Sequence, residues 1–301
     1  MSDLFPDAAR QLRTVRDLMR FAVSRFTEAR LFFGHGTETA YDEAAYLILH
    51  TLHLPLDHLE PFLDAQLLPA EVSEVLSVLE RRVQERIPAA YLTHEAWLGE
   101  FRFYVDERVI VPRSHIAGIL DQGLASWIPD PDAVTRALDL CTGSGCLAIL
   151  VAHFFPQAKV DAGDLSPAAI EVARRNVKDY GLEERVRVVE SDLFTALGDA
   201  RYDIIVSNPP YVTQAAMQAL PAEYRHEPVL ALAGGDDGLS IVRRILKEAK
   251  SRLTRNGVLV VEVGAGREAV TAAYPDLELT WLETDAGGDP VFLVERAHLP
   301  G

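Results

Sequence analysis

The stretch Ala137–Leu150 reads ALDLCTGSGCLAIL and has the pattern of a strand, a glycine turn and a helix. Its spacing Gly143-x-Gly145-x-x-Ala148 is typical of the loop after the first strand of a dinucleotide-binding fold. Asp164 lies near the spacing expected of an acid that binds a ribose. We therefore predict an α/β domain with a cofactor at this loop; the alternative is a tight turn with only a structural role.

From about residue 115 onward, the chain alternates strand and helix patterns around this stretch. Five apolar runs indicate strands separated by helical patterns, and they cover 136–140, 159–164, 186–190, 202–207 and 258–263. Two further strands, 277–283 and 291–295, are joined by TDAGGDP, which is too short for a helix, so they must pair antiparallel. This order predicts a seven-stranded, doubly wound sheet with one reversed strand.

An acidic residue near the end of the first strand distinguishes two cofactors that the glycine loop leaves open. A dinucleotide would place its pyrophosphate at the helix N-terminus, where the carboxylate of Asp139 would work against it. S-adenosylmethionine instead carries a sulfonium and an ammonium group, which favour a nearby carboxylate. The terminal antiparallel hairpin also fits class I methyltransferases, and Asp192 and Leu193 are placed to meet an adenine. The sequence thus favours a methyltransferase over a nicotinamide dehydrogenase.

The first part of the chain carries helical patterns only. Apolar positions recur at helical spacing over 8–30, a second helix starts after Thr39, and a third covers about 69–86. The segment that follows alternates aromatic and polar residues and indicates a β-hairpin-like linker. We therefore expect a helical domain for substrate recognition, a linker and a catalytic domain, at 1–93, 94–114 and 115–301.

The composition limits which classes of binding partner and which cellular compartment are expected. The chain has a formal net charge of −16 and no strongly basic run, which disfavours direct nucleic-acid binding and accommodates a basic protein partner. We find neither a membrane-spanning apolar stretch nor a secretory signal. Cys141 and Cys146 are the two cysteines and favour a reducing compartment, so we expect a cytoplasmic protein. His50, His53 and His58 lack the companions of a metal motif, and no metal is expected.

A second informative stretch, Ile204–Val212, reads IIVSNPPYV. Proline has no backbone N–H and a fixed φ, so the proline pair ends the strand abruptly. The asparagine and the prolines fall at the carboxyl edge of the predicted sheet, where doubly wound folds bind their ligands. A simple strand-ending turn is the alternative interpretation.

Together, DLCTGSGC, DLSPAAIEVARRN, SDLF and SNPPYV resemble the protein glutamine methyltransferases and the related amino methyltransferases of nucleic acids. The resemblance implies that the side-chain oxygen of Asn208 and the carbonyl of Pro209 accept hydrogen bonds from the substrate NH₂ group. It also implies that Tyr211 packs on the plane of that group. Pro209 and Pro210 would stiffen the loop and leave its carbonyls without a neighbouring donor.

This assignment agrees with the chemistry of an amide nitrogen, whose lone pair is delocalised into the carbonyl and is therefore poorly nucleophilic. Two fixed acceptors orient both N–H bonds and favour a pyramidal nitrogen, so the main contribution would be alignment of nitrogen, methyl and sulfur. No general base is required, because the methylated nitrogen becomes acidic and loses its proton afterwards.

Other segments extend the resemblance over nearly the whole chain. VPRSHIAGIL implies that Arg113 helps to close the site, the alternative being an ordinary exposed arginine of the linker. EPVLALAGGDDGL implies that Glu227 and Pro228 shape a loop over the site. Release-factor enzymes usually have DLGTGSG, whereas DLCTGSGC is similar to enzymes that methylate a glutamine of ribosomal protein L-three. Leu31–Ala44, LFFGHGTETAYDEA, is similar to a segment of those same enzymes. Within it, His35 is a candidate substrate contact or a structural loop residue.

The candidate cofactor-binding residues are Asp139, Cys141, Thr142, Gly143, Ser144, Gly145, Asp164, Leu165, Asp192, Leu193 and Asn208. We expect methyl transfer from S-adenosylmethionine to a glutamine of ribosomal protein L-three. Three alternatives stay open, namely a release-factor enzyme, an amino methyltransferase of nucleic acid, and a cofactor-binding module without activity.

Overall fold

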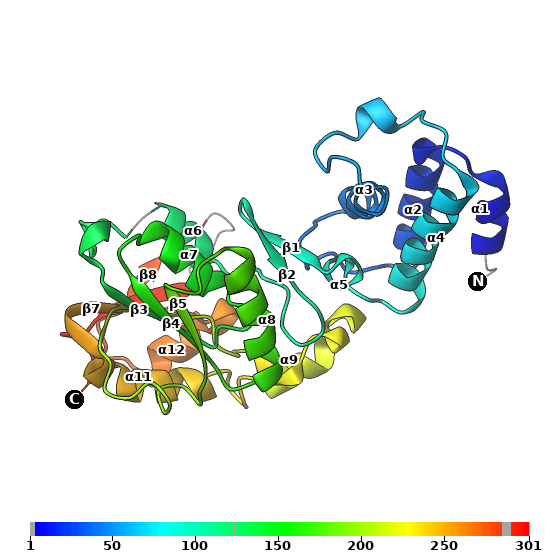
Figure 1. Ribbon diagram of the computed structural model, residues 1–301. Helices are drawn as coiled ribbons and strands as arrows, with labels where there is room; N and C mark the ends of the chain where they lie inside the picture. The colour runs from blue at the N-terminus through cyan, green and yellow to red at the C-terminus, as the bar shows by residue number, and fades with distance from the viewer. Residues whose placement is uncertain (1–3, 123, 285–289, 301) are drawn as a thin grey trace. The chain divides into compact units, whose positions relative to one another are not determined.

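The computed structural model describes residues 4–122, 124–284 and 290–300, and it divides the chain into two compact units (Figure 1). The helical unit comprises Met1–Ala96 and Pro221–His226. The sheet unit comprises Trp97–Leu220 and Glu227–Gly301. Sequence analysis did not foresee that residues 221–226, which follow the NPPY stretch, pack within the helical unit.

The helical unit is built from helices, two of which begin at threonine caps. They are α1 (Phe5–Gln11), α2 (Val15–Glu28), α3 (Ala40–Thr51), η1 (Glu60–Phe62), α4 (Pro69–Gln84), α5 (Ala89–Thr93) and η3 (Ala222–His226). The hydroxyls of Thr14 and Thr39 accept hydrogen bonds from the third residue of α2 and of α3, as N-caps do. Because Thr14 starts a new helix, the helical pattern over 8–30 divides into α1 and α2.

The apolar faces of these helices form one core, as the helical spacing predicts. Its most deeply buried large side chains are Leu18, Phe26, Leu47, Ile48 and Leu79. Each such side chain contributes roughly 1.5–3 kcal/mol by leaving water. The helical unit therefore has a hydrophobic core of its own.

Two short strands, β1 (Glu95–Leu98) and β2 (Phe101–Tyr104), form a two-stranded sheet within the predicted hairpin linker. The boundary between the units falls inside β1, between Ala96 and Trp97. Residues 105–115 then continue without strand or helix. We call residues 105–115 the strap, because they reach the site described below.

The sheet unit contains a seven-stranded sheet in the order β5-β4-β3-β6-β7-β9-β8. The strands are β3 (Arg136–Leu140), β4 (Lys159–Asp164), β5 (Val186–Glu190), β6 (Tyr202–Ser207), β7 (Leu253–Glu262), β8 (Thr280–Leu282) and β9 (Val291–Glu295). Strands β3 to β7 pair in parallel, and β9 pairs antiparallel with both β7 and β8. The predicted doubly wound sheet with one reversed strand is confirmed. Most of the TDAGGDP turn, 285–289, lies outside the described residues.

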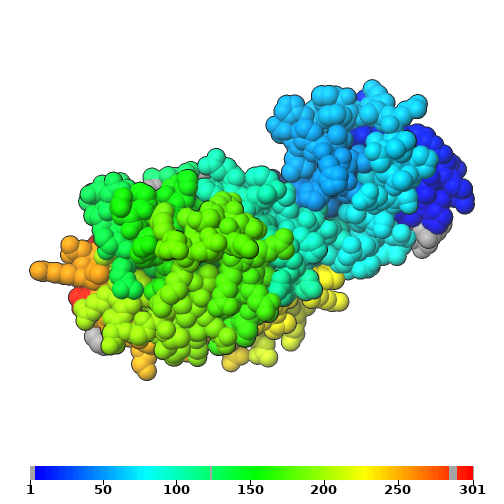
Figure 2. Space-filling view, viewed as in Figure 1, coloured from blue at the N-terminus to red at the C-terminus, as the bar shows by residue number. Residues whose placement is uncertain are grey.

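Helices cover both faces of this sheet. On one face lie α6 (Ile116–Gln122), α7 (Cys146–Phe154) and α8 (Pro167–Asp179), and on the other α11 (Ser240–Arg252) and α12 (Arg267–Ala273). In β9, Val291 and Leu293 join the first core and Phe292 and Val294 the second, which is the period of two of a strand buried on both faces. In the space-filling view, the middle of the chain, in green, forms much of the visible face of the sheet unit (Figure 2). No helix in the described ranges is long and apolar enough to cross a bilayer.

Three details differ from the sequence prediction. Strand β7 begins at Leu253 rather than Val258, because the polar stretch LTRNG gives no apolar signal, and β8 is shorter than the predicted 277–283. The helix expected between β5 and β6 is replaced by turns in the described residues 191–201. There the Ser191 hydroxyl donates to the Leu193 carbonyl and accepts from the Ala196 N–H, which folds the chain tightly.

The register of the parallel strands places the functional segments together. Leu140 pairs with Gly163 of β4 on one side and with Ser207 of β6 on the other. Asp164 in turn pairs with Glu190 of β5. The residues that follow these strands therefore emerge at one edge of the sheet.

Candidate active site

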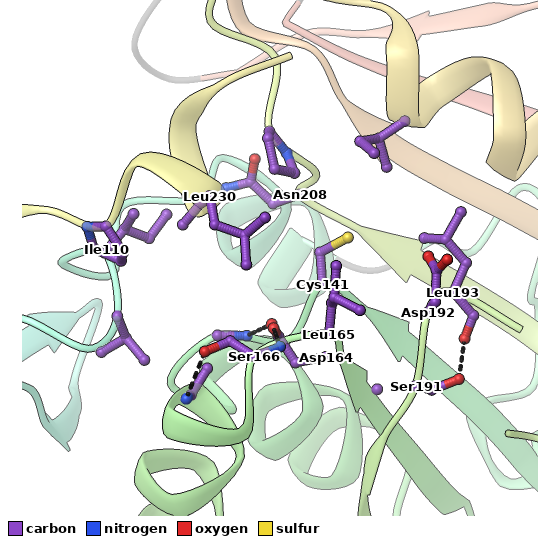
Figure 3. Close-up of a pocket in the computed structure, with 18 of the residues that line it drawn as sticks. Ile110, Cys141, Asp164, Leu165, Ser166, Ser191, Asp192, Leu193, Asn208 and Leu230 are labelled. Carbon is purple, nitrogen blue, oxygen red and sulfur yellow. Dashed lines mark hydrogen bonds between the residues drawn. The ribbon is translucent and has the colours of Figure 1, made fainter. Parts of the chain in front are cut away.

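A cavity of about 150 Å³ lies at this carboxyl edge. The residues of the sequence prediction that line it are Cys141, Gly143, Asp164, Leu165, Asp192, Leu193, Asn208 and Pro210. Figure 3 shows Asn208 and Leu230 on one side of it and Asp164, Leu165 and Ser166 on the opposite side. The cavity thus brings together loops from four neighbouring strands.

Asp164 organises the glycine loop at one side of the cavity. Its Oδ2 accepts a hydrogen bond from the Gly143 N–H at 2.8 Å, and its Oδ1 accepts one from the Ser166 N–H at 2.9 Å. Gly143 and Gly145 have φ values of 54° and 82°, which glycine adopts without strain. Burial raises the pKa of Asp164, so further hydrogen-bond donors, such as hydroxyl groups of a ligand, would stabilise its charged form.

Asp139 is fully buried and does not line the cavity. Its Oδ2 accepts hydrogen bonds from the Thr142 hydroxyl and from the Ala148 N–H, so it fixes the glycine loop to the start of α7. Its Oδ1 has no hydrogen-bond partner among the described residues. Burial raises the pKa of Asp139 to about 7, and the nearby Asp164 adds to this rise.

Two residues of the cavity wall hold an unfavourable backbone conformation. Cys141 has a φ of 61° and Leu193 a φ of 51°, in the left-handed region that favours glycine. Such strain is concentrated at functional sites, where the surrounding structure enforces it. Burial raises the pKa of the Cys141 thiol, so we assign the thiol a packing role rather than a nucleophilic one.

Asp192 and Leu193 reach the cavity from the turn after β5. The Oδ1 of Asp192 accepts a hydrogen bond from Arg244 of α11 at 2.8 Å. Sequence analysis did not identify Arg244, since a basic residue on an amphipathic helix carries no signal of its own. This ion pair is half exposed, so it orients Asp192 more than it stabilises the fold.

Asn208 and the two prolines after it directly follow β6 at the carboxyl edge of the sheet. The Asn208 side chain lines the cavity and makes no hydrogen bond to any described residue. The Pro209 carbonyl likewise accepts none from the described part of the chain. Pro209 itself is buried, whereas Pro210 lines the cavity. The Asn208 side chain therefore faces the cavity with no hydrogen-bond partner among the described residues.

Tyr211 does not line the cavity but is packed closely by glycines from two other segments. A Cβ on Gly234 would lie 2.6 Å from the Tyr211 Cα, and one on Gly238 would lie 2.5 Å from the Tyr211 carbonyl oxygen. A Cβ on Gly264 would lie 2.5 Å from the Tyr211 ring. The glycines of AGGDDGL and VGAG therefore allow the NPPY loop to lie against the neighbouring backbone.

A buried carboxylate holds the other end of Tyr211. Glu262, at the end of β7, accepts hydrogen bonds from the Tyr211 hydroxyl at 3.3 Å, the Ser114 hydroxyl at 2.6 Å and the His115 N–H at 2.9 Å. Burial raises the pKa of Glu262, and these three donors act in the opposite direction. Glu262 thus joins the NPPY loop to the strap.

The strap forms a cavity wall that sequence analysis did not identify. Its residues Arg108, Val109 and Ile110 line the cavity. Arg113 does not, because its guanidinium pairs with both oxygens of Glu227. Glu227 also accepts a hydrogen bond from the Val111 N–H at 3.0 Å. Arg113 therefore fastens the strap to the loop that carries Pro228 and Leu230.

The other predicted residues lie outside the cavity wall. Thr142 and Ser144 are buried in the glycine loop, and Gly145 packs against Ala173 of α8. His35 belongs to the helical unit and is buried there, with its ring centroid 4.6 Å from that of Tyr224. Its burial leaves His35 little surface for a substrate contact.

The doubly wound sheet with β9 reversed, the glycine loop after β3 and the cavity at the carboxyl edge define a class I methyltransferase fold. A family model, the methyltransferase small domain, matches residues 117–223.

Relatives identify the family more narrowly. The ribosomal protein uL3 glutamine methyltransferase of Neisseria meningitidis serogroup B is 60% identical over 298 residues, which cover 99% of this chain and 98% of the relative. That of Bordetella pertussis is 59% identical over 289 residues, covering 96% of this chain and 97% of the relative. The chain therefore belongs to the family of ribosomal protein uL3 glutamine methyltransferases, and the resemblance found in the sequence is confirmed.

A solved structure, hMettl16 catalytic domain in complex with MAT2A 3'UTR hairpin 6, is 17% identical and matches with a TM-score of 0.47. The match covers 74% of this chain and 80% of that one. A likeness of this degree says nothing about the substrate.

The close packing of glycines around Tyr211 can be tested by replacing one glycine with alanine, which adds one methyl group. We expect Gly234→Ala to displace the NPPY loop, because its Cβ would meet the Tyr211 backbone, and to destabilise the protein by about 1–3 kcal/mol. The melting temperature and the methyl-transfer rate would both fall. The matched control is Gly118→Ala in α6, where a Cβ meets nothing within 4 Å and the melting temperature should hold or rise. Equal effects of the two substitutions would contradict this assignment.

Proposed function

We propose that this protein transfers a methyl group from S-adenosylmethionine to the side-chain amide nitrogen of a glutamine in ribosomal protein uL3. The observation that carries the proposal is the Asn208 side chain, which lines the cavity and makes no hydrogen bond to any described residue, followed in the chain by the Pro209 carbonyl, which accepts none from the described part of the chain. An NH₂ group with two N–H bonds is the natural complement of two such acceptors. The names of the relatives supply the glutamine and the ribosomal protein.

The residues of the cavity fit this cofactor. Asp164 is partly buried and suits the hydroxyl groups of a ribose, and Asp192 and Leu193 reach the same cavity for an adenine. The unpartnered Oδ1 of Asp139 is a buried acceptor close to the glycine loop and suits a cationic donor. When bound, S-adenosylmethionine would supply an electrophilic methyl group on a sulfonium.

The residues of this chain would then act mainly by orientation. Asn208 and Pro209 would hold the amide NH₂ by both hydrogens, which turns the nitrogen lone pair toward the methyl group. Tyr211, fixed by its glycine neighbours and by Glu262, would limit the movement of the amide plane. The proton leaves after transfer, when the nitrogen is acidic, so no side chain is assigned as a general base.

The substrate would be held by the helical unit. With a net charge of −16, the protein complements a strongly basic ribosomal protein, and this charge would speed their encounter. We place the reaction in the cytoplasm, where ribosomal proteins are made. No nucleic-acid contact is required, and free or early-assembling uL3 is the expected acceptor.

The decisive experiment presents methyl-labelled S-adenosylmethionine and three acceptors, namely uL3 from cells lacking the enzyme, release factors and DNA. We expect label on uL3, at a glutamine side chain when the protein is digested and analysed by mass spectrometry. Label on release factors but not on uL3 would overturn the substrate, and label on DNA would overturn the class of acceptor.

Removing the clamp should separate binding from chemistry. Asn208→Ala should leave cofactor affinity within about tenfold of wild type while the transfer rate falls by about two or more orders of magnitude, because an orienting group is lost. Calorimetry and single-turnover rates measure the two quantities. Gln218→Ala removes an exposed amide of α9 (Gln214–Ala219) and serves as the control that should change neither. A wild-type rate in Asn208→Ala would remove Asn208 from the mechanism.

Cofactor affinity should depend on the ionisation of Asp139. Its folded pKa of about 7 lies above the ordinary value of 3.8, so the folded protein without cofactor is mostly protonated there below pH 7. A cationic ligand favours the ionised form, and its affinity should therefore rise several-fold, or roughly eightfold at most, from pH 6 to 7.5. Isothermal titration at several pH values measures this. Asp139→Asn should give weaker binding with a flatter profile; an unchanged profile would show that Asp139 does not sense the cofactor.

A further inference from the structure

The segment 221–226 is a short excursion of the catalytic chain into the helical unit. Its neighbours Leu220 and Glu227 both belong to the sheet unit, whereas Pro221–His226 belongs to the helical unit. The chain therefore crosses between the units three times, after Ala96, after Leu220 and after His226. The last two crossings lie in the loop that follows the NPPY stretch.

The centre of this excursion is held by a buried carboxylate. Glu223 has only 1% of its side chain exposed, and its Oε1 accepts hydrogen bonds from the Phe32 N–H at 3.0 Å and from Arg86 at 3.0 Å. Arg82, equally buried, lies 3.4 Å from the same oxygen. Burial opposes ionisation, but these donors outweigh it and hold the pKa of Glu223 below its usual value.

Arg82 also ties Glu223 to the segment Leu31–Ala44, which distinguished this subfamily in the sequence. It donates to Glu43 at 2.6 Å and to the Phe32 carbonyl at 2.9 Å. Glu43 is itself buried and accepts a hydrogen bond from the Thr37 hydroxyl. The subfamily segment therefore supplies backbone and side-chain partners to residues 221–226.

The flanks of Glu223 add two further attachments within the helical unit. The Tyr224 ring centroid lies 4.6 Å from that of His35 and 5.7 Å from that of Phe32. The His226 Nε2 lies 2.8 Å from the Glu85 carbonyl oxygen, just after α4. The excursion is thus anchored over most of its length.

The two ends of the loop that contains the excursion are joined next to the amide clamp. The Val212 N–H donates to the Leu232 carbonyl at 2.9 Å, and the Gly234 N–H donates to the Val212 carbonyl at 2.8 Å. Glu227, immediately after the excursion, is held by Arg113 and the Val111 N–H. Residues 213–227 therefore form a short connection from the clamp at Asn208–Tyr211 to the helical unit and back.

We propose that Glu223 is a positioning residue that fastens this connection, so that a protein substrate held by the helical unit presents its glutamine to the Asn208 clamp at high effective concentration. The inference rests on the proposed function and deepens it. The chain joins the two units at three points, after Ala96, Leu220 and His226, rather than at one. Effective concentration depends on linker length and stiffness, so releasing the excursion reduces it without removing any catalytic group.

The test compares two glutamates of the same buried network. Glu223→Gln weakens the hold on the excursion, whereas Glu43→Gln removes an equally buried charge next to the same Arg82 and leaves the Glu223 contacts to Phe32 and Arg86 in place. Full-length variants are assayed for kcat/KM on whole uL3 and on a short peptide carrying the modified glutamine. Their thermal stability and the hydrogen exchange of residues 208–226 are measured in parallel.

We expect Glu223→Gln to lower the ratio of kcat/KM for uL3 to that for the peptide by at least about tenfold, with faster exchange in 221–226. Glu43→Gln should leave the ratio within about threefold, even where it lowers thermal stability as much. Tyr224→Ala, which loosens the excursion without touching a buried charge, should lower the ratio in the same direction and covers the case in which Glu223→Gln does not fold.

An equal fall in both glutamate variants, or no fall in either Glu223→Gln or Tyr224→Ala, overturns the proposal. Failure of the proposed function looks different, because the wild-type protein would then transfer no label to uL3. The ratio is in that case measured with whichever protein acceptor is labelled, and the absence of any protein acceptor overturns the positioning role as well.

Discussion

The parallel pairing of β3 with β4 on one side and with β6 on the other fixes where the glycine loop, Asp164 and Asn208 lie. Leu140 pairs with Gly163 and with Ser207, so the glycine loop, Asp164 and Asn208 must emerge side by side. If a strand shifted its register by one residue, each of its side chains would move to the opposite face of the sheet. The two faces are packed by different sets of helices, so these side chains would meet the core of the other face. The hydrophobic pattern therefore holds the site in register.

Within that register, much of the fold was predictable from the sequence. The bounds of β3, β4, β5 and β6 are the predicted ones, because each strand carries apolar residues in strand spacing between stretches of polar or turn residues. The cofactor loop and the NPPY stretch follow these strands and could be located for the same reason. Strand β7 is longer than its apolar run, because pairing with Tyr202 of β6 extends it into a polar segment.

What could not be predicted depends on contacts between segments far apart in the chain. Gly234, Gly238 and Gly264 suggest turns in sequence, whereas their common feature is close approach to Tyr211. The strap residues Arg108, Val109 and Ile110 have no periodic pattern, since their place is set by loop contacts. Residues 221–226 form a single short turn that no local signal assigns to the helical unit.

Three buried glutamates each accept a hydrogen bond from a backbone N–H far away in the chain. This shared arrangement gives a reason for charged residues at contacts between distant segments. Glu223 accepts a hydrogen bond from the Phe32 N–H, Glu227 from the Val111 N–H and Glu262 from the His115 N–H, across 191, 116 and 147 residues of chain. Each also accepts from a side chain of another segment.

A buried ion pair is often replaceable by apolar residues without loss of stability, so stability alone does not account for these carboxylates. A hydrogen bond to a backbone N–H, however, selects one residue of the partner segment, which an apolar contact does not. The three glutamates hold the excursion 221–226, the strap and the end of β7 at defined residues. The strap borders the cavity, the end of β7 contacts Tyr211, and the excursion belongs to the loop that follows Asn208. The three carboxylates therefore fix loops at single residues, as backbone pairing fixes the strands.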